Sequence, residues 1–307
     1  MNKVRAYAPA TVANLACGFD SLGLAIDSPG DIIEVCKNDT GELKVLSQLN
    51  NINLPLAVDQ NVCSVAIESF RKAFNPTQGY TITMVDKINP GSGIGSSAAS
   101  AVAAVYAVNK LEGEPFTKLQ LMPFALDGEA VASGAIHADN IAACMFGGII
   151  LIRENQPLDI VHLPVPNSLY CTVFYPNLKI NTKESRAALS KTVDLSKAVQ
   201  NSANLASFVH ALHTSDYELI KRSVKDVLVE PQRKQFIKGF DQVKNDALKN
   251  NALAFSISGS GPSVFALSNS KETASALVNV MRVSFLKVNI EGKGYFSSIN
   301  QKGAVII

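Results

Sequence analysis

The pattern of apolar and polar positions predicts a protein that mixes strands and helices. Residues 80–85 alternate and are rich in β-branched side chains, which is typical of a strand. The alanine-rich run at 98–109 follows three glycines and has the composition of a well-packed helix. On the same grounds, strands are expected within 4–27, 31–45, 149–152, 170–176, 254–267 and 303–307, and helices at 61–74, 119–131, 202–213, 217–227, 233–247 and from 270 onward.

Three local signals refine this pattern. Residues 38–41 contain Asn, Asp and Gly, which favour tight turns, so 31–45 is predicted to be two strands joined by a hairpin turn. Asn61 stands just before a helical apolar pattern, where it is a good N-cap. Residues 164–167 interrupt the pattern with two prolines and are the candidate linker between two domains.

Length and composition define the class of protein. The chain has 307 residues, 47% hydrophobic and 18% charged, which is ordinary for one large or two medium globular domains. A net charge of +2 without a dense Lys/Arg stripe gives no reason to expect a nucleic-acid partner. The five scattered cysteines lack metal-ligand spacing and favour a reducing compartment. With no signal-type segment and no run near about 18 apolar residues, a cytoplasmic protein without a membrane partner is expected.

Candidate chemistry begins at residues 89–100, between a strand and the alanine-rich helix. The glycines of this loop allow a tight turn, and free amides at a helix N-terminus attract anions, most often phosphate. The loop lacks the Gly-Lys-Ser/Thr of a Walker motif, and no acidic residue ends a second strand about 20 residues on, as a dinucleotide fold requires. A phosphate loop remains, in which Ser96 and Ser97 could bind phosphate or magnesium. The alternative is a glycine turn without a ligand.

This loop resembles the ATP loop of the small-molecule kinase superfamily of galactokinase, homoserine kinase, mevalonate kinase and phosphomevalonate kinase, the GHMP kinases. Two positions depart from the pattern, because Ile94 replaces the usual leucine and Pro90 lies one residue nearer the glycines. The resemblance implies a two-domain α+β GHMP kinase fold, with a domain like ribosomal protein S5 domain 2 at 1–165 and a ferredoxin-like domain at 166–307. It also implies that ATP is bound by Pro90, Gly91, Ser92, Gly93, Ile94, Gly95, Ser96, Ser97, Ala98, Ala99 and Ser100.

A second resemblance covers residues 13–23, which are similar to the amino-terminal motif of homoserine kinases. Ala16 and Cys17 replace a Gly-Pro pair of that motif. The resemblance implies that Asn14 and Asp20 belong to the substrate site, with Asp20 suited to an ammonium group. The alternative is an Asx-type turn in which both side chains serve the backbone.

The turn at 258–261 resembles the carboxy-terminal glycine motif of the same superfamily. It implies that Gly259 and Ser260 close over the phosphates, whereas the residues alone indicate only a hairpin with a glycine bend. Asn61 and Lys87 border the adenine pocket in the family and are further nucleotide candidates. For Asn61, the N-cap role is the alternative.

Residues 128–140 resemble the superfamily pattern of Gly-Glu followed by Ser-Gly and His-x-Asp-Asn, although Ala143 replaces a usual proline. A half-buried Glu129 needs a positive partner, and Mg²⁺ shared with Ser97 would supply one. The alternative is a glutamate that faces solvent. His137 alone is typical of a structural histidine, and its place in the motif makes it a candidate substrate contact.

Homoserine kinases carry one arginine after Thr-x-x-x and another after Glu-Pro-x, and both are thought to hold the substrate carboxylate. The matching residues are Thr182 with Arg186, and Arg233. Without the resemblance, both arginines would be interpreted as surface charges. The expected substrate is therefore L-homoserine, and Thr182 joins the two arginines as a candidate substrate contact.

Asn140 bears on the mechanism. Mevalonate kinases carry an aspartate base at the matching position, and an amide is no useful base near neutral pH. The prediction is therefore catalysis by positioning, in which Asn14 and Asn140 aim the hydroxyl while magnesium and the loop amides hold the triphosphate. The hydroxyl proton passes to a phosphate oxygen or, as the alternative, to Asp20.

The resemblance thus implies an ATP- and Mg²⁺-dependent homoserine kinase of threonine biosynthesis, and it is compatible with a homodimer. One alternative is a kinase for mevalonate-type or sugar substrates, which would need an acid at position 140 or a different carboxylate clamp. Another is an ATP-binding sensor without activity. The presence of Ser97 and Glu129 argues against the sensor.

Overall fold

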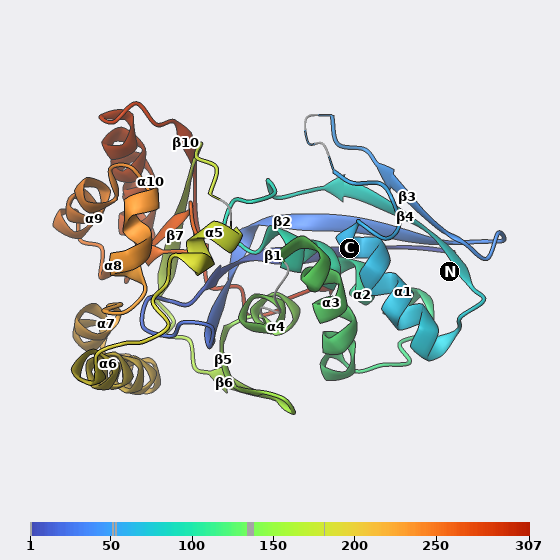
Figure 1. Ribbon diagram of the computed structural model, residues 1–307, viewed down its shortest axis with the longest axis horizontal. Coiled ribbons are helices and arrows are strands. Elements are labelled where there is room, and N and C mark those ends of the chain that lie inside the picture. Colours follow the sequence, from blue (N-terminus) through green and yellow to red (C-terminus); the bar gives the residue numbers. More distant parts are fainter. Residues whose placement is uncertain (1, 51, 53, 134–137, 181) are drawn as a thin grey trace.

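The structure of the protein is a computed structural model that describes residues 2–50, 52, 54–133, 138–180 and 182–307. Its elements are arranged around two β-sheets, and helices pack against each sheet (Figure 1). The expected mixture of strands and helices in an α+β fold is confirmed.

The first sheet is built around two long antiparallel strands, β1 and β2, which are joined by a turn at residues 14–21. The second half of β2 pairs with β4 and its start pairs with β5, so β2 links the two ends of the sheet. The strands are β11 (Val305–Ile306), β1 (Lys3–Ala13), β2 (Leu22–Asn38), β4 (Gly79–Asp86) and β3 (Leu43–Ser47) in spatial order, with β5 (Ile149–Asn155) on β2 and β6 (Leu158–Leu163) on β5.

Helices α1 to α4 lie together below this sheet in Figure 1, and α2 and α4 pack directly on β1 and β2. Their bounds are Val62–Phe74 for α1, Ser96–Leu111 for α2, Lys118–Ser133 for α3 and Ala138–Phe146 for α4. The alanines of α2 are fully buried, because small side chains let its backbone approach strands and helices closely. This packing fixes the start of α2 at the middle of the molecule.

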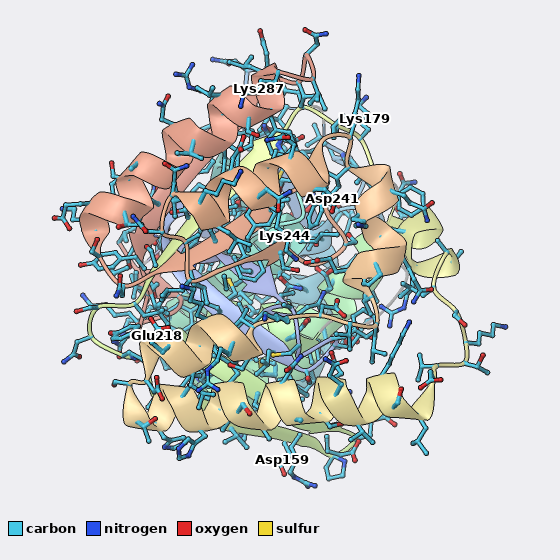
Figure 2. The ribbon with its side chains drawn as sticks, turned by 90° about the vertical axis from the view of Figure 1, so that its left-hand side faces the viewer. Asp159, Lys179, Glu218, Asp241, Lys244 and Lys287 are labelled. Atoms are coloured by element: carbon cyan, nitrogen blue, oxygen red, sulfur yellow. The ribbon has the colours of Figure 1, made fainter. Side chains whose placement is uncertain are left out.

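The second sheet has the order β10-β7-β9-β8 and is entirely antiparallel. Its strands are β7 (Tyr170–Pro176), β8 (Ala254–Ile257), β9 (Val264–Ser268) and β10 (Gly292–Ser298). Helices α9 (Phe240–Lys249) and α10 (Lys271–Leu286) pack on one face of this sheet, and α5 (Thr182–Ala187), α6 (Leu195–Thr214), α7 (Tyr217–Ser223) and α8 (Glu230–Arg233) complete this half of the chain. Figure 2 views the molecule from the side of these helices, where Glu218, Asp241 and Lys287 lie on the surface.

The hairpin predicted within 31–45 is wrong. A turn does follow Asn38, but β3 pairs in parallel with β4, and β4 lies between β2 and β3. The apolar residues Ile82 and Met84 of β4 are buried. Burial of this strand between two neighbours outweighs the local turn preference, because strand pairing is decided mainly by packing.

The helix predicted at 233–247 is interrupted. Gly239 adopts a positive φ of 85°, which separates α9 from the short α8 and a 3-10 turn at Lys234–Phe236. Arg233 therefore ends its own short helix instead of beginning a long one. Strands β6 and β10 were not predicted, since neither combines clear alternation with a buried face.

The chain crosses from the first sheet to the second at residues 164–167, between β6 and β7, and its last strand β11 returns to the first sheet. The domain boundary at 165/166 stays a prediction. Within the described ranges, no helix is both long and apolar enough to span a membrane.

Candidate active site

The glycine loop at residues 89–95 enters α2 directly, in the predicted order of strand, loop and helix. Gly91, Gly93 and Gly95 all have positive φ values, of 71°, 81° and 69°, which few other residues adopt. Gly95 is the N-cap of α2 and makes no side-chain capping hydrogen bond, so the first turn offers backbone N–H groups. Together with the dipole of this helix, they form a site suited to phosphate.

The turn at 258–263 from the second sheet docks on this loop. Ser258 Oγ donates to Gly93 O at 2.7 Å, and Ser263 N donates to Ser92 O at 3.2 Å. A Cβ built on Gly93 would lie 2.5 Å from Gly261 O, so only glycine permits this approach. Two glycine turns from opposite halves of the chain therefore meet at one place.

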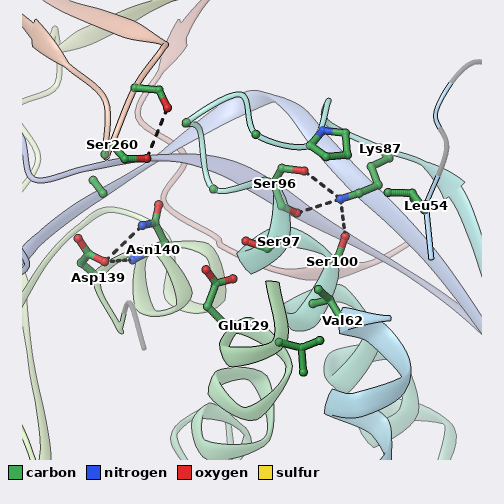
Figure 3. Close-up of a pocket in the computed structure, with 18 of the residues that line it drawn as sticks. Leu54, Val62, Lys87, Ser96, Ser97, Ser100, Glu129, Asp139, Asn140 and Ser260 are labelled. Atoms are coloured by element: carbon green, nitrogen blue, oxygen red, sulfur yellow. Dashed lines mark hydrogen bonds between the residues drawn. The ribbon is translucent and has the colours of Figure 1, made fainter. Parts of the chain in front are cut away.

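A buried ion pair lies beneath the loop. Lys87 Nζ is 3.0 Å from Asp31 Oδ2 and also donates to Ser96 Oγ at 2.9 Å and Ser100 Oγ at 2.7 Å (Figure 3). The side chains of Asp31 and Lys87 are 0% and 6% exposed. Burial raises the pKa of the Asp31 carboxyl, and the charge of Lys87 opposes that rise. The ammonium of Lys87 is thus hydrogen-bonded to two serines at the start of α2 and stabilises this end of the helix.

A cavity of about 460 Å³ lies beside these elements, within the usual size range of small-molecule sites. Most of the predicted site residues line it: Asn14, Asp20, Asn61, Lys87, Pro90, Gly91, Gly93, Gly95, Ser96, Ser97, Ser100, Glu129, Asn140, Arg186, Arg233, Gly259 and Ser260. Four loop and helix residues are buried and are not among its lining residues: Ser92, Ile94, Ala98 and Ala99.

Ser97 and Glu129 line the same part of the cavity. Glu129 is only 4% exposed, near the end of α3, and Figure 3 shows its carboxylate on the same side of the loop as Ser97. The interpretation of Glu129 as a solvent-facing residue is therefore wrong. In the described part of the chain, no three His, Cys, Asp or Glu side chains could hold a metal by themselves. One carboxylate and one hydroxyl fit Mg²⁺, which takes few protein ligands and completes its shell with phosphate and water.

Asn14 connects the turn after β1 to the second sheet. It has a φ of 72°, its Oδ1 accepts from Asp20 N at 3.0 Å, and its Nδ2 donates to Gly259 O at 3.0 Å. Both ends of the carboxamide thus serve the backbone, as the Asx-type alternative predicts for Asn14, whereas the carboxylate of Asp20 pairs with Arg186. Each end retains hydrogen-bonding capacity, because an amide can make four hydrogen bonds.

Asn140 lies in the first turn of α4 and lines the cavity. Its Oδ1 accepts from Thr11 Oγ1 at 2.7 Å, and its Nδ2 donates to Asp139 Oδ1 at 3.3 Å (Figure 3). Asp139 is itself 2% exposed and lines the cavity. The carboxamide is therefore held at both ends within a buried polar group.

Two arginines that line the cavity approach one aromatic ring. The guanidinium carbons of Arg186 and Arg233 lie 5.7 and 5.2 Å from the centre of the Phe19 ring. Arg186 Nη2 forms an ion pair with Asp20 Oδ2. Two guanidinium groups and one carboxylate thus lie close together, and this arrangement is suited to a ligand that carries both an acid and an amine.

Arg233 is 4% exposed, so its interpretation as a surface charge is wrong. Its Nη1 donates to Gly259 O at 3.0 Å, and its Nε has no hydrogen-bond partner in the part of the chain that the structure describes. Burial lowers the pKa of Arg233; the charge of Asp20 opposes this shift and that of Arg186 adds to it. A buried guanidinium with an unused donor is suited to an anionic ligand.

Three predicted residues need separate mention. Asn61 caps α1, because its Oδ1 accepts from Cys63 N at 3.0 Å, and it also lines the cavity. The N-cap prediction is confirmed. His137 and the side chain of Thr182 lie outside the described residues, so their roles stay predictions.

Sequence reasoning did not identify Thr11, Asp31 or Asp139 as members of the site. Each has a recognisable signal, because a polar or charged residue inside an apolar segment must find a partner when it is buried. Thr11 lies in a largely apolar part of β1, Asp31 comes directly before two isoleucines in β2, and Asp139 lies in a largely apolar helix. Which partners they find depends on contacts between distant segments.

Comparisons with known proteins agree with this geometry. The family model described as GHMP kinases N terminal domain matches residues 61–148, and the model described as GHMP kinases C terminal matches residues 208–285. The two matches cover the glycine loop and the cavity residues from Asn61 to Asn140, and in the second half Arg233 and the 258–261 turn.

The similarity to individual proteins extends over the full chain. The chain is 41% identical to homoserine kinase of Chlorobaculum tepidum, covering 100% of this chain and 99% of the relative. It is 39% identical to homoserine kinase of Chlorobium phaeobacteroides, covering 100% of both. It matches the crystal structure of homoserine kinase from Cytophaga hutchinsonii with a TM-score of 0.96 and 43% identity, over 100% of this chain and 98% of the other. The chain therefore belongs to the homoserine kinase family of the GHMP kinases.

Proposed function

We propose that the cavity transfers the γ-phosphoryl group of ATP to the hydroxyl of L-homoserine, which gives O-phospho-L-homoserine and ADP. The names of the full-length relatives support this activity. One geometric observation supports the proposed activity. The phosphate-type loop and the cluster of Asp20, Arg186 and Arg233 line the same cavity, so a triphosphate and a charged acceptor can be held together.

The nucleotide half would use backbone groups for the phosphates. The N–H groups of the loop and of the first turn of α2 are suited to their oxygens. Ser97 and Glu129 would hold Mg²⁺, which supplies charge neutralisation to the transferred phosphoryl group. Lys87 and Asp31 support the loop from beneath and leave the contact with phosphate to the backbone.

The acceptor half would recognise a zwitterion by exchange of charges. The Asp20–Arg186 pair is accessible, with side chains 38% and 41% exposed. The α-ammonium of homoserine can replace Arg186 on Asp20, and its α-carboxylate can bind Arg186 and the unused donor of Arg233. A neutral sugar has no charged group to make these contacts.

The hydroxyl of homoserine would be aimed at the γ-phosphorus by Asn140 and Asn14. Neither amide is a useful base near neutral pH, so the oxygen attacks as the bond from phosphorus to the ADP oxygen breaks. The hydroxyl proton passes to an oxygen of the transferred phosphoryl group. A loose transition state needs little deprotonation of the nucleophile, which makes a base dispensable.

Other parts of the proposal rest on the family resemblance. They are the dependence on Mg²⁺, a place in threonine biosynthesis, a cytoplasmic location and a homodimer. None of them is needed for the argument from the cavity.

A coupled assay of ADP release tests the proposed reaction. With ATP and Mg²⁺, we expect turnover with homoserine and none with mevalonate, galactose, threonine or no acceptor. Mass spectrometry of the product should show one added phosphoryl group. Turnover with a different acceptor would keep the ATP site and overturn the acceptor assignment, and nucleotide binding without any turnover would favour the sensor.

A further inference from the structure

We propose that Thr11 is a positioning residue that fixes the carboxamide of Asn140 relative to the phosphate loop. Thr11 lies near the end of β1, is fully buried and does not line the cavity. Its Oγ1 donates to Asn140 Oδ1 at 2.7 Å, and its backbone N–H donates to Ile94 O in the loop at 3.1 Å. One residue of a central strand therefore contacts both the nucleotide half and the acceptor half of the site.

The hydrogen bonds define which way the Asn140 carboxamide faces. Nδ2 donates to Asp139 Oδ1 at 3.3 Å, and a carboxylate oxygen accepts only. The oxygen end must then face Thr11, whose hydroxyl can donate. The reversed amide would set its oxygen against the carboxylate. One N–H and one lone pair of the amide are left, and both are available to a substrate hydroxyl.

Gly95 shows how closely the loop approaches this pair. A Cβ built on Gly95 would lie 2.0 Å from Thr11 Oγ1 and 3.1 Å from Asn140 Oδ1. Any side chain there would displace the hydroxyl of Thr11 or the amide of Asn140. Gly95, the N-cap of the helix whose first N–H groups would bind phosphate, thus packs against the side chain that would aim the acceptor hydroxyl.

The inference rests on the proposed role of Asn140 in aiming the hydroxyl. If the Thr11 hydroxyl is removed, Asn140 Oδ1 loses its donor, and the carboxamide is held only by the bond from its Nδ2 to Asp139 and can turn more about χ2. Phosphoryl transfer needs the acceptor oxygen in line with the γ-phosphorus, so a small error in position lowers the rate of the chemical step. Binding of either substrate changes less, because other residues make the charged contacts.

Thr11→Val tests this, because valine has the shape of threonine without the hydroxyl. We expect kcat to fall about 10- to 100-fold while the KM values for ATP and homoserine stay within about twofold. Thr172→Val is the matched control, since Thr172 is also fully buried in a strand and donates to Ala274 O at 2.8 Å, far from the cavity. The control should retain kcat. An unchanged kcat in Thr11→Val, or an equal loss in the control, would overturn the proposal.

The same substitution in an Asn140→Ala background separates this inference from the proposed function. If Thr11 acts through Asn140, Thr11→Val lowers kcat by less than about twofold in that background. If Thr11→Val lowers kcat by as large a factor in the Asn140→Ala background as in the wild type, the inference is contradicted. If Asn140→Ala itself retains kcat, the proposed role of Asn140 is wrong. If Asn140→Ala loses activity and Thr11→Val does not, only the role of Thr11 is wrong.

A pair of smaller substitutions tests the proposal if Thr11→Val does not fold. Serine and cysteine are similar in size, but serine is a strong donor and cysteine a weak one. We expect Thr11→Ser to retain kcat within about threefold and Thr11→Cys to lose at least about tenfold. Equal kcat values for the two variants would overturn the proposal, because a role in packing alone does not distinguish them.

Discussion

The two halves of the cavity each contain an ion pair, and the two pairs differ in their exposure to solvent. In the nucleotide half, Lys87 and Asp31 form an ion pair whose side chains are 6% and 0% exposed. In the acceptor half, Arg186 and Asp20 form one whose side chains are 41% and 38% exposed. The buried pair is tied to the backbone and to two serines, whereas the accessible pair connects the turn after β1 to α5.

This difference separates a structural ion pair from one that a ligand can replace. Breaking a buried pair leaves a charge without a partner in a medium of low polarity, so that pair is fixed. An exposed pair is worth little by itself and can exchange its partners with a zwitterion at small cost. The arrangement keeps the phosphate loop rigid and leaves the acceptor site open to exchange.

The buried pair should give the largest effect on stability. Asp31→Asn keeps an acceptor for Ile88 N but leaves Lys87 without its counter-charge, so we expect a loss of about 3–5 kcal/mol in the free energy of unfolding. Urea denaturation followed by circular dichroism measures it. Asp159→Asn is the control, because it removes an exposed partner of Arg153 and should leave the midpoint unchanged. If the wild type, Asp31→Asn and Asp159→Asn unfold at the same urea concentration, the buried pair does not stabilise the fold.

Glu129 tests the nucleotide half during turnover. Glu129→Gln removes the charge proposed to hold Mg²⁺ and keeps the size of the side chain, so we expect kcat to fall about 100-fold. The Mg²⁺ concentration for half-maximal rate should rise as well. Glu112→Gln is a suitable control, since Glu112 is also mostly buried but bonds to Tyr80 and Lys37. A Mg²⁺ dependence like that of the wild type would exclude Glu129 as a ligand.

Asn14 lies between the two halves, because it bonds to Asp20 N and Gly259 O. We expect Asn14→Ala to lower kcat about tenfold and to change ATP affinity much less. Steady-state kinetics and nucleotide titration measure the two effects. Equal changes in both would assign Asn14 to closure of the turn over the nucleotide, and the role in aiming the hydroxyl would be lost.

Phe19 should give the smallest effect. Its ring lies within cation–π distance of both arginines, and such contacts are weak at partly exposed sites. We expect Phe19→Leu to raise the KM for homoserine about threefold, with kcat unchanged and Phe19→Tyr close to the wild type. A KM that Phe19→Leu leaves unchanged would indicate that the ring is only a spacer.

Local sequence features predicted the strand, the glycine loop and the helix at its end correctly. Glycines at alternate positions, a preceding strand and an alanine-rich helix are all adjacent in the chain, so residues 79–111 could be predicted without tertiary information. The N-cap role of Asn61 is local for the same reason. The two-domain fold and the assignment of the arginines to a substrate carboxylate came from the resemblance to GHMP kinases.

What the sequence could not provide depends on contacts between distant segments. The turn at 38–41 was recognised, but the insertion of β4 between β2 and β3 brings together residues about 40 positions apart. No local pattern indicates that the ammonium of Lys87 pairs with Asp31 on a neighbouring strand. Thr11 and Asn140 are 129 positions apart, and no local pattern indicates that they meet.

In the proposed reaction, one cavity binds ATP together with an acceptor whose carboxylate is held by Arg233. The most direct test compares kcat/KM for homoserine and for homoserine amide, which lacks the carboxylate, in the wild type and in Arg233→Met. For the wild type, we predict a preference of about 100-fold for homoserine, and in Arg233→Met a preference reduced at least about tenfold, since only Arg186 then remains to bind the carboxylate. An unchanged preference in Arg233→Met would contradict the claim, because the carboxylate would then be recognised elsewhere.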